Sequence, residues 1–265
     1  MVQLRAVVLG SSELRNVAAA NDPKIEVAAA DLDQLLASDI DVDHVCTPNA
    51  THFEIARKAL QAGKDVVCEK PLGVGSEQSE QLQGLAEKHG LVATVPFVYR
   101  FHPIAREARG LISAGVVVEL RSICGHYLQD WMSRPTATNW RREKSTGGPA
   151  RAFADIGSLL VNLLEFVTSD RVGRLCARTR TAYAGRNEKV VSKEEVVAVL
   201  FETCRGVLRT LMVSQVAPGR KDALTFEVNG ALQSLPFEPE DPEIHSARVD
   251  DAVLKSAAVD TWVSV

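Results

Sequence analysis

Lys70 stands between an acid and a proline at the end of a short apolar run. Residues 65–72 read Asp-Val-Val-Cys-Glu-Lys-Pro-Leu, and residues 65–68 have the length and composition of a buried strand. Ligands of parallel sheets bind just beyond the carboxyl ends of the strands. Desolvation at such a place lowers the pKa of a lysine toward neutrality, which makes an acid–base group. The alternative is a surface lysine at a strand end.

A second group of polar residues follows the apolar run 44–47 and consists of Thr47, Pro48, Asn49 and His52. The first turn of the helix that comes next offers backbone amides without an intrahelical acceptor. This turn can therefore hold the polar groups of a ligand. The alternative is a plain helix entry, capped by Asn49 or by the capping box that begins at Thr51.

Asp155 opens a helix predicted over residues 155–167. Leu159 and Asn162 follow it at spacings of four and seven, which place all three side chains on one helical face. The helix is apolar nearly all round, as is typical of a buried element. Asp155 is therefore either a functional carboxylate or the N-cap of this helix.

The segment 129–141 combines aromatic and polar residues, namely Gln129, Asp130, Trp131, Trp140 and Arg141. An aromatic face beside polar groups suits a carbohydrate ring. The alternative is a long loop that its tryptophans anchor. Three single histidines, His102, His126 and His245, are more typical of structural positions than of catalysis.

The first half of the chain alternates apolar runs with helical patterns. The runs that predict strands span residues 4–9, 24–30, 44–47, 65–68 and 91–96. Helices are predicted over residues 51–62, 76–89 and 103–114, and a glycine follows each of them. Strands that alternate with helices indicate an α/β fold with a doubly wound parallel sheet.

The second half has the pattern of an antiparallel sheet. Residues 196–202 and 207–214 are apolar runs with a hairpin-like break between them. Asn229-Gly230 is the preferred dipeptide of a two-residue type I′ hairpin. Such an open sheet needs one face covered, by the helix at 155–167 and, in an assembly, by a partner chain.

The composition limits the partners and the compartment. A length of 265 residues suits one large or two medium domains, and we place two, at residues 1–116 and 117–265. A net charge of −4 gives no excess of positive charge that would bind nucleic acid or anionic lipid. No apolar run is long enough to span a membrane. Five scattered cysteines predict neither a disulfide framework nor a metal site. Without a signal-peptide pattern, the chain is expected in the cytoplasm.

Three motifs carry a resemblance to the Gfo/Idh/MocA oxidoreductase family: Thr47-Pro48-Asn49, Ala62-Gly63-Lys64 and Glu69-Lys70-Pro71-Leu72. The likeness continues at residues 95–103, 127–131, 139–141, 147–148, 155–157 and 256–265. It implies a Rossmann-type dinucleotide-binding domain, followed by an α/β domain with an open, mainly antiparallel sheet. It also implies an NAD(P)-dependent oxidoreductase that transfers a hydride between nicotinamide and a hydroxyl or ketone of a sugar or cyclic polyol.

The resemblance also implies roles for single residues. Lys70 would donate to the reacting oxygen and help to move its proton, with Asp155 as the second catalytic residue. Contacts to NAD or NADP would come from Gly10, Thr47, Pro48, Asn49, His52, Glu69, Lys70 and Arg100. The substrate would contact Gln129, Asp130, Trp140, Arg141 and Asn162, in segments like those of levoglucosan-dehydrogenase-like members. A homodimer or homotetramer would form through the C-terminal sheet.

The chain departs from the family pattern on both sides of the expected site. The glycine-rich loop is reduced to Gly10-Ser-Ser-Glu, and only one of the two usual crossovers fits before residue 44. Leu159 stands where the family has its catalytic histidine, and Asn162 where it has a second acid. Asp31, near the distance of the usual ribose-binding acid, looks more like a helix start.

Three interpretations of these departures stay open. The chain is an impaired homologue that acts as a sugar-binding or protein-interaction module, or it is an enzyme in which Lys70 works with water or another residue. The third is that loop residues are missing from it at 10–13, 30–32 or 243–249. Missing loops would not explain Leu159 or Asn162, which are substitutions in place.

Overall fold

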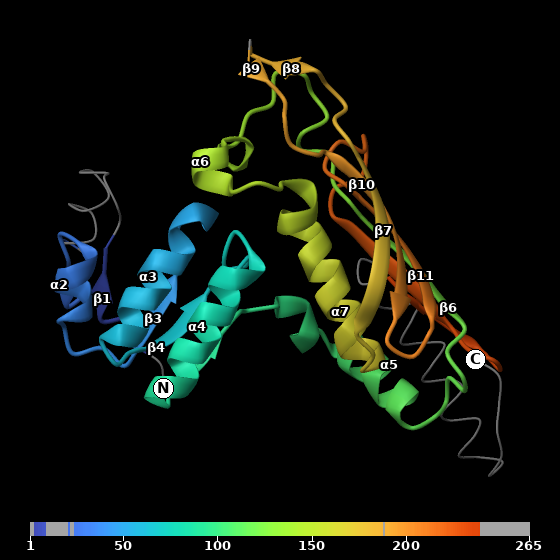
Figure 1. Cartoon of the computed structure of the whole chain (residues 1–265), viewed down its shortest axis with the longest axis horizontal. Helices are drawn as coiled ribbons and strands as arrows, with labels where there is room; N and C mark the ends of the chain where they lie inside the picture. Colours follow the sequence, from blue (N-terminus) through green and yellow to red (C-terminus); the bar gives the residue numbers. More distant parts are fainter. Residues whose placement is uncertain (1–2, 9–20, 22–23, 188, 239–265) are drawn as a thin grey trace. The chain divides into compact units, whose positions relative to one another are not determined.

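A computed structural model gives the structure of the chain and describes residues 3–8, 21, 24–187 and 189–238 (Figure 1). The chain forms two compact units. The first is Met1–Pro96 with Glu143–Gly148, and the second is Phe97–Arg142 with Pro149–Val265. Each unit has a hydrophobic core of its own.

The first unit consists of parallel strands and the helices that follow them. Strand β1 (Ala6–Val7) pairs in parallel with β2 (Val27–Ala28), and a second sheet has the order β3-β4-β5 with parallel pairing throughout. The strands β3, β4 and β5 span Val42–Val45, Asp65–Cys68 and Ala93–Thr94, and the helices α2, α3 and α4 span Leu32–Leu36, Asn49–Gln61 and Ser76–His89. The predicted parallel α/β layer is confirmed.

Helix α3 begins at Asn49, two residues before the predicted capping box. Pro48 occupies the cap position, and its carbonyl oxygen accepts from the backbone N–H of Thr51 (2.9 Å) and from the Thr51 hydroxyl (2.7 Å). The prediction that the helix starts with a capping box at Thr51 is therefore wrong. The other end is as predicted, since Gly63 follows the helix at a φ of 75°.

The core of the first unit lies around β3, β4 and the two longer helices. Val45, Leu60, Val66 and Leu82 are each at most 2% exposed. Full burial of one such side chain contributes about 1.5–3 kcal/mol. This packing fixes the strand ends from which the predicted polar turns emerge.

The second unit is built on a six-stranded sheet with the order β13-β12-β6-β11-β10-β7. Its strands are β6 (Ser122–Leu128), β7 (Val172–Arg180), β10 (Val196–Thr203), β11 (Leu208–Ser214), β12 (Ala223–Asn229) and β13 (Ser234–Phe237). The pair β6–β11 is parallel, and the other neighbours in this sheet are antiparallel. The predicted open, mainly antiparallel sheet is confirmed.

Helices α5 (Pro103–Ser113) and α7 (Ser158–Thr168) cover one face of this sheet (Figure 1). Alternate strand residues point toward them, so Val199 is 5% and Leu211 is 4% exposed. Met212, on the opposite face, is 42% exposed. The sheet therefore has one buried face and one open face.

The β12–β13 connection differs from the predicted two-residue turn. Asn229 pairs with Ser234, so residues 230–233 form a four-residue loop, which the Gly230 N–H closes through a hydrogen bond of 3.0 Å. The prediction of a type I′ turn at Asn229-Gly230 is wrong. Gly230 instead allows the backbone to lie close to the Val117 side chain, since a Cβ at position 230 would lie 2.5 Å from a methyl carbon of Val117.

Helix α5 belongs to the second unit, so the predicted boundary after residue 116 differs from the division that the structure shows. Arg109 of this helix donates to the carbonyl oxygen of Phe166 (2.7 Å), and its guanidinium carbon lies 4.5 Å from the centre of the Phe166 ring. These contacts tie α5 to α7.

Short elements complete the described fold. They are η1 (Val98–Phe101), η2 (Trp140–Arg142), α6 (Lys144–Gly147), the π-helical turn η3 (Phe153–Gly157), and the hairpin of β8 (Gly185–Arg186) with β9 (Lys189–Val190). Within the described ranges, no helix combines the length and the apolar character needed to cross a membrane.

Candidate functional site

Lys70 lies directly beyond β4, as predicted. Pairing of β3 with β4 ends at Cys68, and the backbone N–H of Glu69 then bonds the carbonyl oxygen of Val45 (2.9 Å). Lys70 follows, partly buried, and its backbone N–H donates to Oε2 of Glu69 (3.2 Å). Because the two strands are parallel and paired in register, their carboxyl ends meet at one edge of the sheet. The Lys70 turn and the Thr47 turn share that edge.

His52 connects these two turns. Its Nε2 lies 2.7 Å from the carbonyl oxygen of Thr47, and its Nδ1 lies 2.8 Å from that of Pro71. The residue is 1% exposed. Both ring nitrogens therefore face backbone oxygens inside the protein, and the side chain fixes the spacing of the two turns.

The Thr47 turn combines exposed and buried polar groups. Thr47 and Pro48 are exposed, whereas Asn49 is 7% exposed. The Thr47 and Thr51 hydroxyl oxygens lie 2.7 Å apart. The backbone N–H groups of Asn49 and Ala50, at the start of α3, have no intrahelical acceptor. With the ammonium group of Lys70, this donor set fits the hydroxyl and carboxamide oxygens of a nicotinamide riboside.

The other end of the predicted cofactor site is described in part. Gly10 lies outside the described residues, as do the loop positions 10–13 and 243–249. Asp31 caps α2, because its Oδ1 accepts from the backbone N–H of Gln34 (2.8 Å). The interpretation of Asp31 as a helix start is confirmed.

Asp155, in the second unit, lies inside the turn η3. Its backbone N–H donates to the carbonyl oxygen of Arg151 (2.9 Å), so the turn begins before it and the N-cap alternative is wrong. The Asp155 side chain is 12% exposed. Its Oδ2 accepts from Nε2 of Gln215 (2.8 Å), and its Oδ1 lies 3.2 Å from Nε of Arg141 in an ion pair.

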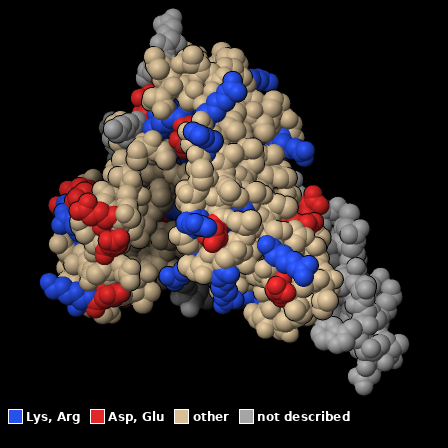
Figure 2. Space-filling model, turned by 45° about the vertical axis from the view of Figure 1, so that its right-hand side comes forward, with Lys and Arg blue, Asp and Glu red and all other residues tan. Residues whose placement is uncertain are grey.

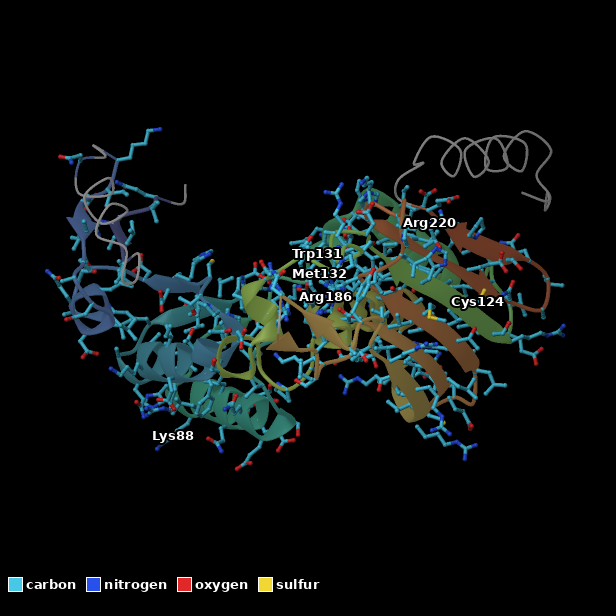
Figure 3. All side chains as sticks on the ribbon, turned by 90° about the horizontal axis from the view of Figure 1, so that it is seen from above. Lys88, Cys124, Trp131, Met132, Arg186 and Arg220 are labelled. Atoms are coloured by element: carbon cyan, nitrogen blue, oxygen red, sulfur yellow. The ribbon has the colours of Figure 1, made fainter. Side chains whose placement is uncertain are left out.

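A buried ionic network lies behind this carboxylate. Arg151 and Arg186 both bind Oε1 of Glu195, at 3.0 Å and 2.8 Å, and all three residues are at most 2% exposed. Burial opposes the ionisation of Glu195, but the Ala182 amide and the two guanidinium groups outweigh burial and lower its pKa. Figure 3 shows Arg186 close to Met132, whose carbonyl oxygen it binds (2.6 Å).

No motif of the sequence predicts this network. Two features of the sequence correspond to it. Ser214 ends the apolar run of β11 and Gln215 follows it, and Glu195 directly precedes the apolar run of β10. Polar residues at the ends of apolar runs could have marked these segments, but not the contacts between them.

Two of the predicted substrate residues, Trp140 and Arg141, lie near Asp155. Arg141 forms the ion pair with Asp155, and Trp140 contacts Arg141. The Arg141 guanidinium carbon lies 4.3 Å from the centre of the Trp140 ring. Trp140 remains 37% exposed. The structure therefore brings a carboxylate, a guanidinium group and a partly exposed aromatic ring together.

Gln129 and Asp130 have contacts of their own. Gln129 accepts from the indole of Trp131 (2.7 Å) and donates to Asp222 (2.6 Å). Asp130 pairs with Lys221 (2.8 Å), and this hydrogen bond lowers the Asp130 pKa. No described contact links either side chain to Asp155.

Leu159 and Asn162 have different surroundings. Leu159 belongs to the hydrophobic core of the second unit and is 9% exposed. Asn162 accepts from Nε of Arg100 (2.6 Å), and the Arg100 guanidinium carbon lies 5.5 Å from the centre of the Phe166 ring. Arg100, expected at the cofactor, thus belongs to the second unit and contacts Asn162.

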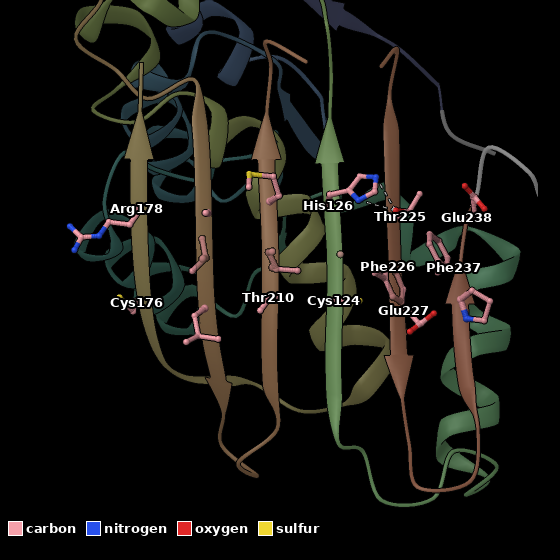
Figure 4. A pocket seen from close by; sticks show the side chains of 17 residues that line it. Cys124, His126, Cys176, Arg178, Thr210, Thr225, Phe226, Glu227, Phe237 and Glu238 are labelled. Atoms are coloured by element: carbon pink, nitrogen blue, oxygen red, sulfur yellow. Dashed lines mark hydrogen bonds between the residues drawn. The ribbon is translucent and has the colours of Figure 1, made fainter. Parts of the chain in front are cut away.

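The single histidines lie in structural surroundings. His126 points from the open face of the sheet, where Nε2 lies 3.1 Å from the Thr225 hydroxyl (Figure 4), and burial lowers its pKa. His102 packs edge-on to Phe237 at a centroid distance of 6.2 Å. His245 lies outside the described residues.

Within residues 3–8, 21, 24–187 and 189–238, no three His, Cys, Asp or Glu side chains cluster in a way that could hold a metal ion. On the face shown in Figure 2, basic and acidic side chains are interspersed with uncharged surface.

Two family models match the chain. Residues 3–97 match the NAD-binding Rossmann fold of the Gfo/Idh/MocA oxidoreductase family, and residues 105–235 match the C-terminal domain of the same family. The chain belongs to the Gfo/Idh/MocA family. The resemblance found in the sequence is confirmed, and with it the NAD-binding Rossmann fold of the first part of the chain.

Individual members of the Gfo/Idh/MocA family agree with this assignment. Levoglucosan dehydrogenase of Pseudarthrobacter phenanthrenivorans is 29% identical over 220 residues, which are 76% of this chain and 56% of that protein. D-xylose 1-dehydrogenase (NADP(+)) 2 of Haloferax volcanii is 27% identical over 256 residues, which are 89% of this chain and 77% of the relative.

Solved structures give the same result. An oxidoreductase domain protein from Kribbella flavida has a TM-score of 0.84 at 33% identity, over 90% of this chain and 65% of its own. Levoglucosan dehydrogenase in complex with NADH and levoglucosan has a TM-score of 0.83 at 28% identity, over 89% of this chain and 64% of its own. The chain thus spans less than two thirds of the length of these structures and 56% of the curated levoglucosan dehydrogenase.

Proposed function

We propose that this chain acts as an NAD(P)-dependent oxidoreductase, which transfers a hydride between nicotinamide and a hydroxyl or ketone of a sugar or cyclic polyol. The observation that carries the proposal is the position of Lys70 beyond β4, on a turn that His52 ties to the Thr47 turn. The relatives support the substrate class, since they include a levoglucosan dehydrogenase and a D-xylose dehydrogenase.

Lys70 manages the proton in the proposed reaction. The bound nicotinamide supplies the acceptor for the hydride that leaves the carbinol carbon. Lys70 donates to the reacting oxygen and relays the hydroxyl proton to solvent while the carbonyl group forms. In the reducing direction Lys70 donates the proton to the new alkoxide. One hydride and one proton leave the substrate, so the products balance.

The other residues have supporting roles in this proposal. Thr47, Pro48, Asn49 and the first amides of α3 contact the nicotinamide half of NAD or NADP, together with Glu69. His52 acts on the cofactor through the two turns that it joins. On the substrate side, Asp155 accepts from a ring hydroxyl.

Arg141 and Trp140 complete the substrate side. Arg141 offers donors to hydroxyl oxygens, and the face of Trp140 packs on the sugar ring. Gln129, Asp130 and Asn162 remain substrate candidates of the family pattern, but their described partners are Asp222, Lys221 and Arg100.

The experiment follows nicotinamide absorbance with levoglucosan, D-xylose and myo-inositol, and compares wild type with Lys70→Met. We expect Lys70→Met to lower kcat/KM by about 10²–10⁴-fold, as for other positioned acid–base groups. Lys58→Met is the matched control, because Lys58 lies on α3 and pairs with Asp33 at the surface. An equal loss in the control would contradict the role of Lys70.

Leu159 favours a non-catalytic family member, and the comparisons give that alternative no support. The same experiment separates the two. If no sugar changes the absorbance and calorimetry detects no binding of NAD(H) or NADP(H), the enzyme proposal fails. Binding of cofactor and sugar without turnover would favour a sugar-binding module.

We also propose that two copies of the chain pair through the open face of the six-stranded sheet. This face has a depression of about 790 Å³, with Met212 and Leu200 42% and 48% exposed (Figure 4). Light scattering tests the proposal, and Met212→Glu should shift a dimer toward monomers.

The five cysteines are unpaired, which supports a reducing compartment such as the cytoplasm.

A further inference from the structure

We propose that Gln215 is a positioning residue that keeps Asp155 in the acceptor form and orients it toward the substrate. The inference rests on the proposed function, which gives Asp155 a substrate hydroxyl to bind. Gln215 is fully buried, at 0% exposure, and its side chain bridges Asp155 and Arg151. No motif of the sequence pointed to it.

The orientation of the Gln215 amide follows from its partners. Oε1 accepts from Nε of Arg151 (3.3 Å), and Nε2 donates to Oδ2 of Asp155 (2.8 Å). A guanidinium group is only a donor, so the amide oxygen has to face Arg151. The amide N–H groups then have to face Asp155. A rotation of the amide by half a turn would place N–H against N–H.

Arg151 is itself fixed. Its Nη1 donates to Oε1 of Glu195 (3.0 Å), and its backbone N–H donates to Oε1 of Glu194 (2.8 Å). Glu195 also accepts from Nε of Arg186 (3.0 Å) and from the backbone N–H of Ala182 (2.8 Å). The buried ionic network therefore fixes Arg151, Arg151 fixes the orientation of the Gln215 amide, and this amide donates to Asp155.

The consequence for Asp155 is a fixed chemical role. Oδ2 accepts an N–H of Gln215 (2.8 Å), and Nε of Arg141 lies 3.2 Å from Oδ1, so both neighbours favour the ionised carboxylate. The carboxylate can accept a hydrogen bond from a sugar hydroxyl. It is not arranged to replace the missing histidine as a general acid.

The charged groups around this pair come from four segments. They are Arg141 of η2, Arg151 before η3, Arg186 of β8, and Lys193, Glu194 and Glu195 before β10. Lys193 donates to the carbonyl oxygen of Arg141 (2.8 Å) and so supports the residue that pairs with Asp155.

The direct test is the titration of the Asp155 carboxyl carbon by NMR, with Asp155→Asn for assignment. Gln215→Met keeps the volume but removes the donor, and we expect the midpoint to rise by about one pH unit. Gln215→Glu places a second carboxylate beside the first, and we expect a larger rise. If Gln215→Met does not fold, Gln215→Asn withdraws the amide by one methylene group, and a rise is again expected.

Kinetics provide the second reading. We expect Gln215→Met to lower kcat/KM by about 10–100-fold and to leave cofactor affinity unchanged, because a displaced carboxylate affects the substrate only. Thr168→Val is the control. It removes a buried contact of Arg209 (3.0 Å) at the other end of α7, so it lowers stability without touching Asp155.

Three results would decide the matter. An unchanged midpoint in all Gln215 variants overturns the proposal. A raised midpoint with kcat/KM no lower than in Thr168→Val also overturns it, because the orientation would then not serve the reaction. If the wild type oxidises no sugar, the proposed function fails, while the titration still decides whether Gln215 controls Asp155.

Discussion

The hydroxyl groups of Tyr99 and Tyr127 lie 2.8 Å apart inside the second unit. Tyr99 comes from η1 and Tyr127 from β6, and their rings meet edge to face with centroids 6.1 Å apart. Tyr127 is 3% exposed, and burial, together with the hydrogen bond to Tyr99, raises its pKa. The pair places a polar link within the apolar cluster of the second unit.

This raised pKa predicts a loss of stability in alkali. The folded state keeps the Tyr127 proton above about pH 10, where an exposed tyrosine ionises, so the stabilisation declines as pH rises beyond that value. Tyr127→Phe should cost about 1 kcal/mol at pH 7 and show a smaller decline. Urea unfolding at pH 7 and pH 10.5 measures both. An identical decline in the two proteins would contradict this assignment.

His52 is predicted to control cofactor affinity without touching the cofactor. His52→Leu removes both contacts between the Thr47 turn and the Pro71 turn, and we expect the dissociation constant for NAD(H) to rise about tenfold, since a hydrogen bond and the close polar contact opposite it are lost. Calorimetry measures it. His89→Leu, at the exposed end of α4, is the matched control and should bind as the wild type does.

Glu195 is predicted to link stability to acid. Its pKa is lower in the folded state, so its contribution is present above the unfolded value of about 4.3 and is lost as pH falls below it. Glu195→Gln leaves Arg151 and Arg186 without a charged partner, and we expect a loss of about 3–5 kcal/mol at pH 7. Denaturant unfolding at pH 7 and pH 4 should show a smaller acid dependence in the variant. If wild type and Glu195→Gln lost the same stability between pH 7 and pH 4, the acid dependence would come from other acidic residues.

Cys68 is predicted to resist thiol reagents in the folded protein. It is 0% exposed, and burial raises its pKa to about 12, so almost no thiolate is present at pH 8. The other four cysteines are exposed. A thiol count should therefore give four reactive groups in native protein and five after unfolding. Cys68→Ala should leave the native count unchanged.

Leu159→His is predicted to destabilise the protein. The imidazole would enter an apolar cluster, and an unpaired polar group there costs about 1–3 kcal/mol in addition to lost packing. The loss of stability should be larger at low pH, because the imidazole is protonated more readily in the unfolded state than in the buried, folded one. Thermal unfolding at pH 7.5 and pH 5.5 tests this. A variant as stable as the wild type at both values would show that position 159 has room for a polar group.

Elements with strong local signals could be predicted from the sequence. Helix α4 ends at His89 because Gly90 takes a φ of 66°, and helix α5 starts at Pro103, both as expected. Strand β7 was not predicted, since Arg174, Cys176 and their neighbours are exposed on both faces and show no alternation. The parallel pairing of β6 with β11 depends on contacts distant in sequence, which no local pattern encodes.

The same distinction applies to the site. Lys70 could be predicted because a strand end, an acid and a proline lie within a few residues. Gln215 could not, because Asp155 precedes it by 60 residues and its orientation depends on Arg151 and Glu195. A carboxylate can be found in a motif, but the groups that decide its role are brought to it by the fold.

The burial of Leu159 also limits how this chain can change. An imidazole at position 159 would enter the apolar cluster and bring the protein toward its stability threshold. A histidine there would therefore require a compensating change elsewhere in the cluster. New proton-transfer chemistry in this chain is consequently expected from groups other than position 159, with Lys70 as the candidate.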